Sequence, residues 1–149
     1  MRSEDELLIE AACRKLMTRY CIGLDTRDAD LFLSVFSADA IWELVNDTPR
    51  TLAGHDAIRS YFESRQKKVF NLHLLQNPLV TVTGPTEAEG YCIALIVDGP
   101  WGDGALPVPL RGTEMVTEYR DRFELRPEGW RIVRRTMRKL IDKKSAPPA

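Results

Sequence analysis

The hydrophobic pattern of this chain changes period once, and that change constrains the fold more than any single motif. Apolar side chains recur at helical spacing from Leu8 to Leu24, which predicts an amphipathic helix over about residues 5–26. From about Val69 onward, the pattern is that of strands. Helices followed by strands predict an α+β domain, with about three N-terminal helices packed on one face of a curved antiparallel sheet. Such a sheet folds into a cone-shaped α+β barrel, whose mouth is a natural pocket.

Turn residues and further periodic segments divide the rest of the chain. A second, short helix is expected to begin at residues 28–30 and to run through Phe36, and a third helix follows Gly54. Strands are expected over about residues 40–45, 69–83, 88–97, 111–125 and 130–141. The strand over 69–83 should bend near Asn77-Pro78, because proline cannot donate to a ladder. The length of 149 residues predicts one domain over 1–142, with a disordered tail over 143–149.

Composition excludes several classes of partner. The net charge is −1, so no global field favours nucleic acid or an anionic membrane surface. No apolar run approaches the ~20 residues that span a bilayer, and the acidic N-terminus lacks the apolar centre of a signal peptide. The three cysteines have no metal-ligand spacing, which favours reduced core residues in a cytoplasmic protein. The basic segment 134–139 alternates with apolar residues and is interpreted as an exposed strand face.

Strand period places several polar side chains on inward faces. His73 shares a face with Asn71 and Leu75, and in the next strand Asp98 ends a face of small residues that begins at Cys92. In the long strand, one face reads Thr113, Met115, Thr117, Tyr119, Asp121, Phe123 and Leu125, while the other is rich in charge. Buried polar groups need partners, so the inward ones either pair among themselves or line a wet pocket.

Two residues far apart in the chain carry the strongest chemical signal. Asp25 continues the buried helix stripe of Cys21 by one turn, and His73 is one of only two histidines. A carboxylate that orients an imidazole is the minimal general-base unit. Taken singly, Asp25 is also compatible with a helix-end carboxylate and His73 with a satisfied core histidine. The other histidine, His55, is interpreted as a first-turn residue of a surface helix.

An ordered set of short segments resembles the SnoaL-like branch of the nuclear transport factor 2 superfold, which is also called cystatin-like. The resemblance covers about residues 5–140. It is carried by Tyr20 through Asp25, Asp28, Phe36-Ser37-Ala38-Asp39-Ala40, Gly54-His55-Asp56-Ala57-Ile58, Asn71-Leu72-His73, Tyr119-Arg120-Asp121 and Gly129-Trp130-Arg131-Ile132. The ordered set is specific for the fold and much less so for the reaction.

The resemblance implies roles for particular residues. In the scytalone dehydratase and hexachlorocyclohexane dehydrochlorinase types, an Asp at the end of the first helix pairs with a His on a strand, and Asp25 and His73 fall on these positions. The bile-acid dehydratase type adds a Tyr on the first helix, matched by Tyr20, and an Asp on a later strand, approximately matched by Asp98. In the ketosteroid isomerase type, the general-base Asp aligns near Leu44, which cannot abstract a proton.

The resulting hypothesis is a cofactor-independent lyase of the dehydratase or elimination type, acting on an apolar cyclic or polyketide-like small molecule. His73 would be the base, Asp25 would hold its ring, Tyr20 would donate a hydrogen bond, and Asp98 or Tyr119 would complete the polar set. No metal, nucleotide, nucleic acid or membrane partner is expected, and the protein should form a homodimer or homotrimer. Other readings stay open: a non-catalytic domain that binds a ligand or serves as the small subunit of a ring-hydroxylating dioxygenase, an isomerase or a polyketide cyclase. An epoxide hydrolase built around Arg111 and Asp121 is a further alternative.

Overall fold

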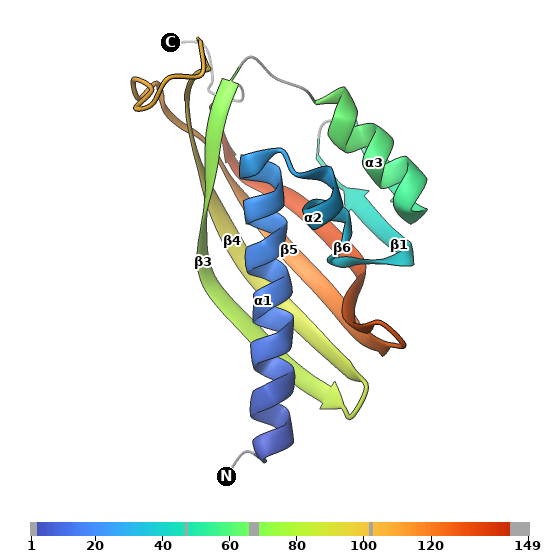
Figure 1. Ribbon diagram of the computed structural model, residues 1–149. Helices are drawn as coiled ribbons and strands as arrows, with labels where there is room; N and C mark the ends of the chain where they lie inside the picture. Colours follow the sequence, from blue (N-terminus) through green and yellow to red (C-terminus); the bar gives the residue numbers. More distant parts are fainter. Residues whose placement is uncertain (1–2, 47, 66–68, 102, 144–149) are drawn as a thin grey trace.

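A long N-terminal helix lies along the inner face of a curled six-stranded sheet (Figure 1). The computed structural model describes residues 3–46, 48–65, 69–101 and 103–143. Its helices are α1 (Glu4–Thr26), α2 (Ala29–Leu33) and α3 (Gly54–Ser64). Its strands are β1 (Phe36–Leu44), β2 (Arg50–Ala53), β3 (Val69–Gly84), β4 (Glu87–Pro100), β5 (Gly112–Arg126) and β6 (Gly129–Asp142). The expected α+β architecture is therefore confirmed, while the proposed tail lies almost entirely outside the described residues.

The sheet has two free edges and mixed strand directions. Its order is β2-β1-β6-β5-β4-β3, so it curls without closing into a barrel. The expectation of a purely antiparallel sheet is wrong at one place, because β1 pairs with β6 in parallel. The paired residues of β1 and β6 are more than 90 positions apart in sequence, a separation long enough for a parallel crossover. Strands β3 to β6 are antiparallel neighbours in chain order, with short turns between β3 and β4 and between β5 and β6 and a longer connection from Pro100 to Gly112.

Local sequence signals fix both ends of α1. Ser3 and Glu6 form a reciprocal capping box, in which the Ser3 hydroxyl accepts from the Glu6 N–H at 3.2 Å. The helix ends at Thr26, and the cap residue Arg27 has left-handed backbone geometry with φ 58°. Gly23 lies against α2 so closely that a Cβ there would be 2.7 Å from the Phe32 nitrogen. The absence of a side chain at Gly23 therefore lets α2 pack on the last turns of α1.

The boundaries differ from expectation around β1. The second helix ends at Leu33 rather than reaching Phe36, because Phe36 already pairs with Ile132 of β6. The ladder then shifts register before Ile41, so residues 37–39, which no expected helix or strand covers, are part of an irregular strand. Strand β2 was not predicted from the sequence. The bend in β3 is confirmed, with Asn77 at φ 52° and a register shift between Gln76 and Leu79.

The face assignments hold for most inward positions and fail at three places. Along β4 and β5, Cys92, Ala94, Thr117, Tyr119 and Phe123 are buried, as expected. Leu125 is 45% exposed near the end of β5, beyond a register shift at residues 122 and 123. Glu118, expected on the solvated face, is buried because Arg120 and Arg138 both donate to its carboxylate. The third departure is Arg135, which is 1% exposed rather than part of a solvated strand face.

Candidate active site

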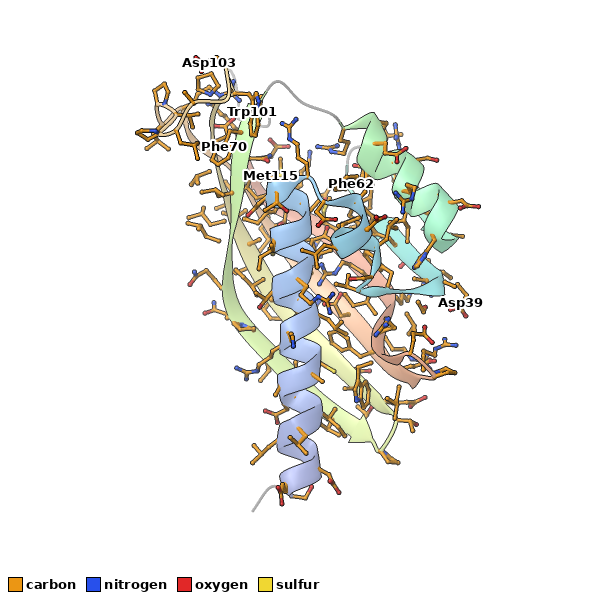
Figure 2. All side chains as sticks on the ribbon, viewed as in Figure 1. Asp39, Phe62, Phe70, Trp101, Asp103 and Met115 are labelled. Carbon is orange, nitrogen blue, oxygen red and sulfur yellow. The ribbon has the colours of Figure 1, made fainter. Side chains whose placement is uncertain are left out.

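Figure 1 shows the C-terminal ends of α1 and α3 at the same end of the molecule as the start of β3. A pocket lies among these segments. Its empty volume is about 890 Å³, which includes open solvent at the mouth. Figure 2 places Phe62, Met115, Phe70 and Trp101 at this end of the molecule. The pocket is lined by Tyr20, Leu24, Arg27, Phe32, Trp42, Tyr61, Phe62, Arg65, Val69, Asn71, His73, Ile96, Met115, Thr117, Tyr119 and Met137. This mainly apolar wall with a few polar groups is typical of a small-molecule site.

His73 and Asp25 meet at the wall of this pocket. The His73 Nδ1 lies 2.5 Å from Asp25 Oδ1, and the His73 backbone N–H donates to both oxygens of the same carboxylate at 3.0 and 3.1 Å. The carboxylate thus holds the strand and the ring together, and both side chains are largely buried, with exposures of 9% and 15%. With Nδ1–H donating to Asp25, the lone pair is on Nε2, which forms no hydrogen bond within the described residues. His73 lines the pocket, so this arrangement can accept a proton from a bound molecule.

Tyr20 and Tyr119 form the inner wall. Their rings make an edge-to-face contact with centroids 5.5 Å apart, and each side chain is 1% exposed. Burial raises the pKa of Tyr20 well above its usual value, and burial likewise raises the pKa of Tyr119 to about 12. Both phenols are therefore neutral at physiological pH and can donate hydrogen bonds. The structure brings these two predicted residues together with His73 and Asp25 around one pocket.

Asp98 is placed differently from the other four predicted residues. It is buried at the end of β4, but it is outside the pocket lining and its carboxylate accepts a hydrogen bond from Arg111. Asp98 pairs with Asn71 across β3 and β4, and of these two residues only Asn71 lines the pocket. Asp98 thus holds the segment before β5 rather than standing beside His73.

The remaining inward carboxylate, Asp121, is fully paired below the pocket. Arg135 donates two hydrogen bonds to it, at 2.7 and 2.6 Å, and both side chains are buried. The guanidinium also lies 4.0 Å from the ring centroid of Tyr20 and 4.6 Å from that of Tyr119. The alternatives left open for Asp121 resolve as a buried ion pair under the aromatic wall. Arg111 and Asp121 have separate partners and are not assembled into one set.

Sequence reasoning missed two members of the lining. Arg27 and Arg65 reach the mouth from the ends of α1 and α3, and no periodicity signal marks them.

Thr117, assigned to the inward face of its strand, does line the pocket together with Trp42, and both side chains are buried. Neither the indole N–H nor the hydroxyl makes a hydrogen bond of good geometry. The aromatic residues Phe32 and Phe62 also line the pocket, whereas Phe123 packs in the core.

Two further polar residues, His55 and Glu43, lie away from the pocket. His55 lies outside the pocket lining, with Nε2 3.0 Å from the Phe36 carbonyl oxygen. Glu43, the carboxylate beside Leu44, is bound by Arg134 and Thr136 away from the pocket.

Over the part of the chain that the structure describes, no three His, Cys, Asp or Glu side chains gather closely enough to hold a metal ion. In the same residues, no helix is long and apolar enough to cross a bilayer.

The sequence also matches the model of a known family. The model of the SnoaL-like domain matches residues 5–136, which is most of the chain. The chain belongs to the SnoaL-like family. A search of curated proteins returned no relative of this SnoaL-like chain.

Solved structures extend the comparison at the level of the fold. A Mycobacterium tuberculosis protein of unknown function is 25% identical, with 93% of this chain and 76% of that chain covered and a TM-score of 0.73. A candidate scytalone dehydratase from Novosphingobium aromaticivorans is 17% identical, covering 99% and 95% of the two chains with a TM-score of 0.77. The type 3 hexachlorocyclohexane dehydrochlorinase of Novosphingobium barchaimii is 18% identical, covering 97% and 98% with a TM-score of 0.76. The SnoaL-like chain also matches, over 90% of its length, a nuclear transport factor 2-like protein of the cystatin-like fold from Novosphingobium aromaticivorans, with 24% identity and a TM-score of 0.71.

Proposed function

We propose that this SnoaL-like protein is a cofactor-independent lyase that catalyses an elimination on a mainly apolar cyclic small molecule. The observation that carries the proposal is the 2.5 Å contact between His73 Nδ1 and Asp25 on the wall of an apolar pocket. A histidine oriented in this way presents a basic nitrogen to the cavity, as general-base catalysis requires. The similarity to a candidate scytalone dehydratase and to a dehydrochlorinase supports the same class of reaction.

The proposed step needs one base and hydrogen-bond donors. His73 Nε2 takes a proton from a ring carbon, the C–H electron pair becomes the new carbon–carbon π bond, and the leaving group departs with its bonding pair. Asp25 stabilises the imidazolium formed in this step. Tyr20 donates a hydrogen bond to a carbonyl or to the leaving group, and Tyr119 beside it supports this donor. The unbonded Trp42 N–H and Thr117 hydroxyl are further groups that a substrate can satisfy.

The proposal is tested by a turnover screen that compares the wild-type protein with a variant that lacks the proposed base. Wild-type protein and the His73→Asn variant are incubated with a panel of cyclic β-hydroxy ketones and halogenated cycloalkanes, and formation of the new double bond is followed by ultraviolet absorbance and NMR. Asparagine has a similar volume but no basic nitrogen. We expect turnover of any accepted substrate to fall by about 10²–10⁴-fold.

The matched control is His55→Asn, which changes the other histidine outside the pocket lining and should leave turnover unchanged. Thermal unfolding of all three proteins confirms that each is folded. Turnover that survives His73→Asn while the protein remains folded would show that the base is assigned to the wrong residue.

The same proton removal begins isomerisation and cyclisation, so the screen also reads exchange of solvent deuterium into substrates. Exchange without loss of a leaving group favours an isomerase or polyketide cyclase in this pocket.

A non-catalytic role has its own support, because the beta subunit of a candidate aromatic-ring-hydroxylating dioxygenase from Novosphingobium aromaticivorans is 16% identical with a TM-score of 0.69. Copurification with a large oxygenase subunit, without turnover, would favour that role.

A further inference from the structure

Two arginine side chains lie at the mouth of the pocket. Arg27 comes from the end of α1 and Arg65 from the residue after α3, and both side chains line the pocket. None of the described residues in the lining is an aspartate or a glutamate. The nearest catalytic carboxylate, Asp25, is engaged by the ring and backbone of His73. A molecule that enters the pocket therefore passes two guanidinium groups.

The Arg65 side chain is held by contacts with an uncharged residue, Tyr61. Its guanidinium donates to the Tyr61 phenol oxygen at 2.9 Å and lies 5.4 Å from the centroid of the same ring. Its side chain is exposed, and no ion pair joins it to any carboxylate of the described residues. The guanidinium carries five N–H donors, so the Tyr61 contact orients the group and leaves most of its fork for another acceptor.

Arg27 is fixed beside the start of β3. It caps α1 with left-handed backbone geometry, and its side chain donates to the Val69 carbonyl at 2.8 Å. The guanidinium also lies 4.5 Å from the centroid of the Trp101 ring. Arg27 thus places a second guanidinium at the mouth of the pocket.

We infer that the substrate of this pocket is an acid, with an apolar ring system held among the aromatic side chains and a carboxylate or similar acidic group held at the mouth by Arg65 and supported by Arg27. The inference rests on the proposed function, in which this pocket is the reaction site. The planar fork of arginine matches a carboxylate, and an anchored acid would fix which ring carbon faces His73. Neutral compounds with the same ring should fit the interior but lack this anchor.

The experiment compares an acid with its neutral isostere. Binding of 2-naphthoate and 2-naphthamide to wild-type protein is measured by isothermal titration calorimetry, and pyrene-1-carboxylate with its amide provides a larger ring. We expect each acid to bind about tenfold more tightly than its amide, which is the gain from a charge-assisted hydrogen bond partly screened by water. The preference should shrink as salt is added.

Charge-removing variants locate the anchor. Arg65→Met should abolish the preference for the acid while leaving amide binding within about twofold, and Arg27→Met should reduce it in part. The matched control is Arg59→Met on the same helix, because Arg59 pairs with Asp30 and Glu63 and is outside the pocket lining. That variant should keep the full preference.

Equal binding of acids and amides, failure of both acids to bind, or a preference that persists in Arg65→Met and Arg27→Met would each overturn the inference. These outcomes are distinct from failure of the proposed reaction. An acid preference that persists in His73→Asn supports the anchor whether or not turnover is found. Elimination from neutral substrates without any acid preference overturns the anchor and leaves the lyase proposal intact.

Discussion

At the scale of single residues, one carboxylate organises the chemical centre. Asp25 binds both the backbone N–H and the ring of His73, so it sets the position of the strand and the tautomer of the imidazole together. A second carboxylate, Asp121, binds Arg135 beneath the aromatic wall. Both residues are largely buried aspartates, but their roles differ because their partners differ. A histidine can exchange a proton, whereas a guanidinium keeps its charge.

Replacing Asp25 by Asn should impair turnover more than binding. An Asn amide can donate to Nδ1, which would move the ring proton to Nε2 and remove the basic lone pair from the pocket. We expect kcat to fall by about 10²–10⁴-fold, with KM changed little. Steady-state kinetics on a substrate from the screen provides the measurement. Asp28→Asn is the matched control, because Asp28 caps α2 and Asn is an equally good cap; a similar loss in that variant would contradict the assignment.

Replacing Asp121 by Asn should strongly destabilise the protein. The change leaves the Arg135 charge buried without its counter-ion, which typically costs about 3–5 kcal/mol. Urea unfolding followed by circular dichroism measures the loss. The double variant Asp121→Leu/Arg135→Met, which removes both charges, should recover much of it. For comparison, Glu87→Gln breaks an exposed pair with Arg122 and should cost less than about 1 kcal/mol. An effect of Asp121→Asn as small as that of Glu87→Gln would argue against a buried charge.

At the scale of elements, the shape of the pocket depends on the close contact between α1 and α2. Gly23 permits α2 to contact α1, and this contact places Phe32 against Tyr20, with ring centroids 5.2 Å apart. Phe32 in turn stacks on Phe62 of α3 at 4.8 Å. Three helices therefore contribute aromatic side chains to the pocket, and the contact at Gly23 brings two of these helices together.

Gly23→Ala should loosen this assembly. The added Cβ would meet the nitrogen, Cα and Cβ of Phe32 at 2.7–2.9 Å, and backbone cannot move aside as a flexible side chain does. Although alanine favours helices, we expect a net loss of about 1–3 kcal/mol in the free energy of unfolding. Chemical denaturation measures it, and weaker binding of the naphthalene probes should accompany it. A more stable protein would contradict the close contact, since only the helix propensity would then remain.

At the scale of the whole molecule, many ionisable groups are buried in their neutral form. Burial raises the pKa of Cys13 and Cys21 to about 12 and that of Cys92 to about 11. The pKa of Tyr119 is raised to about 12 and that of Tyr20 well above its usual value, again chiefly by burial. In the unfolded chain, the thiols lose their protons near pH 9.0 and the phenols near pH 10.0.

Stability should therefore decline on the alkaline side. These raised folded-state pKa values give a contribution that is complete below about pH 9 and is lost as pH rises toward the folded values, because the unfolded state releases protons first. We expect a lower urea midpoint at about pH 10.5 than at about pH 8. Cys13→Ala should flatten this dependence, since it removes one buried thiol. A midpoint that does not change between these two pH values would contradict neutral burial of the groups.

The outer face of the sheet leads to a prediction about assembly. Leu72 and Leu74 of β3 are 38% and 43% exposed and pair with Val97 and Leu95 of β4, on the face opposite the pocket. The expected homodimer or homotrimer stays a prediction, and we place its contact on this apolar face. Leu74→Asp should lower the mass measured by size-exclusion chromatography with light scattering, whereas Leu7→Asp near the start of α1 should not. A wild-type monomer would contradict it.

The sequence by itself predicted every helix and strand except β2 in the correct order and most inward positions of β3, β4 and β5, and the family resemblance predicted the pairing of Asp25 with His73. Periodicity and the ordered segments of the family are local signals, and α1 and β3 follow them closely. The tertiary structure alone decided which inward groups reach the pocket. Strand period assigns a face but not the partner across the sheet, so the diversion of Asp98 to Arg111, the burial of Arg135 against Asp121 and the gathering of Arg27 with Arg65 followed only from register and packing.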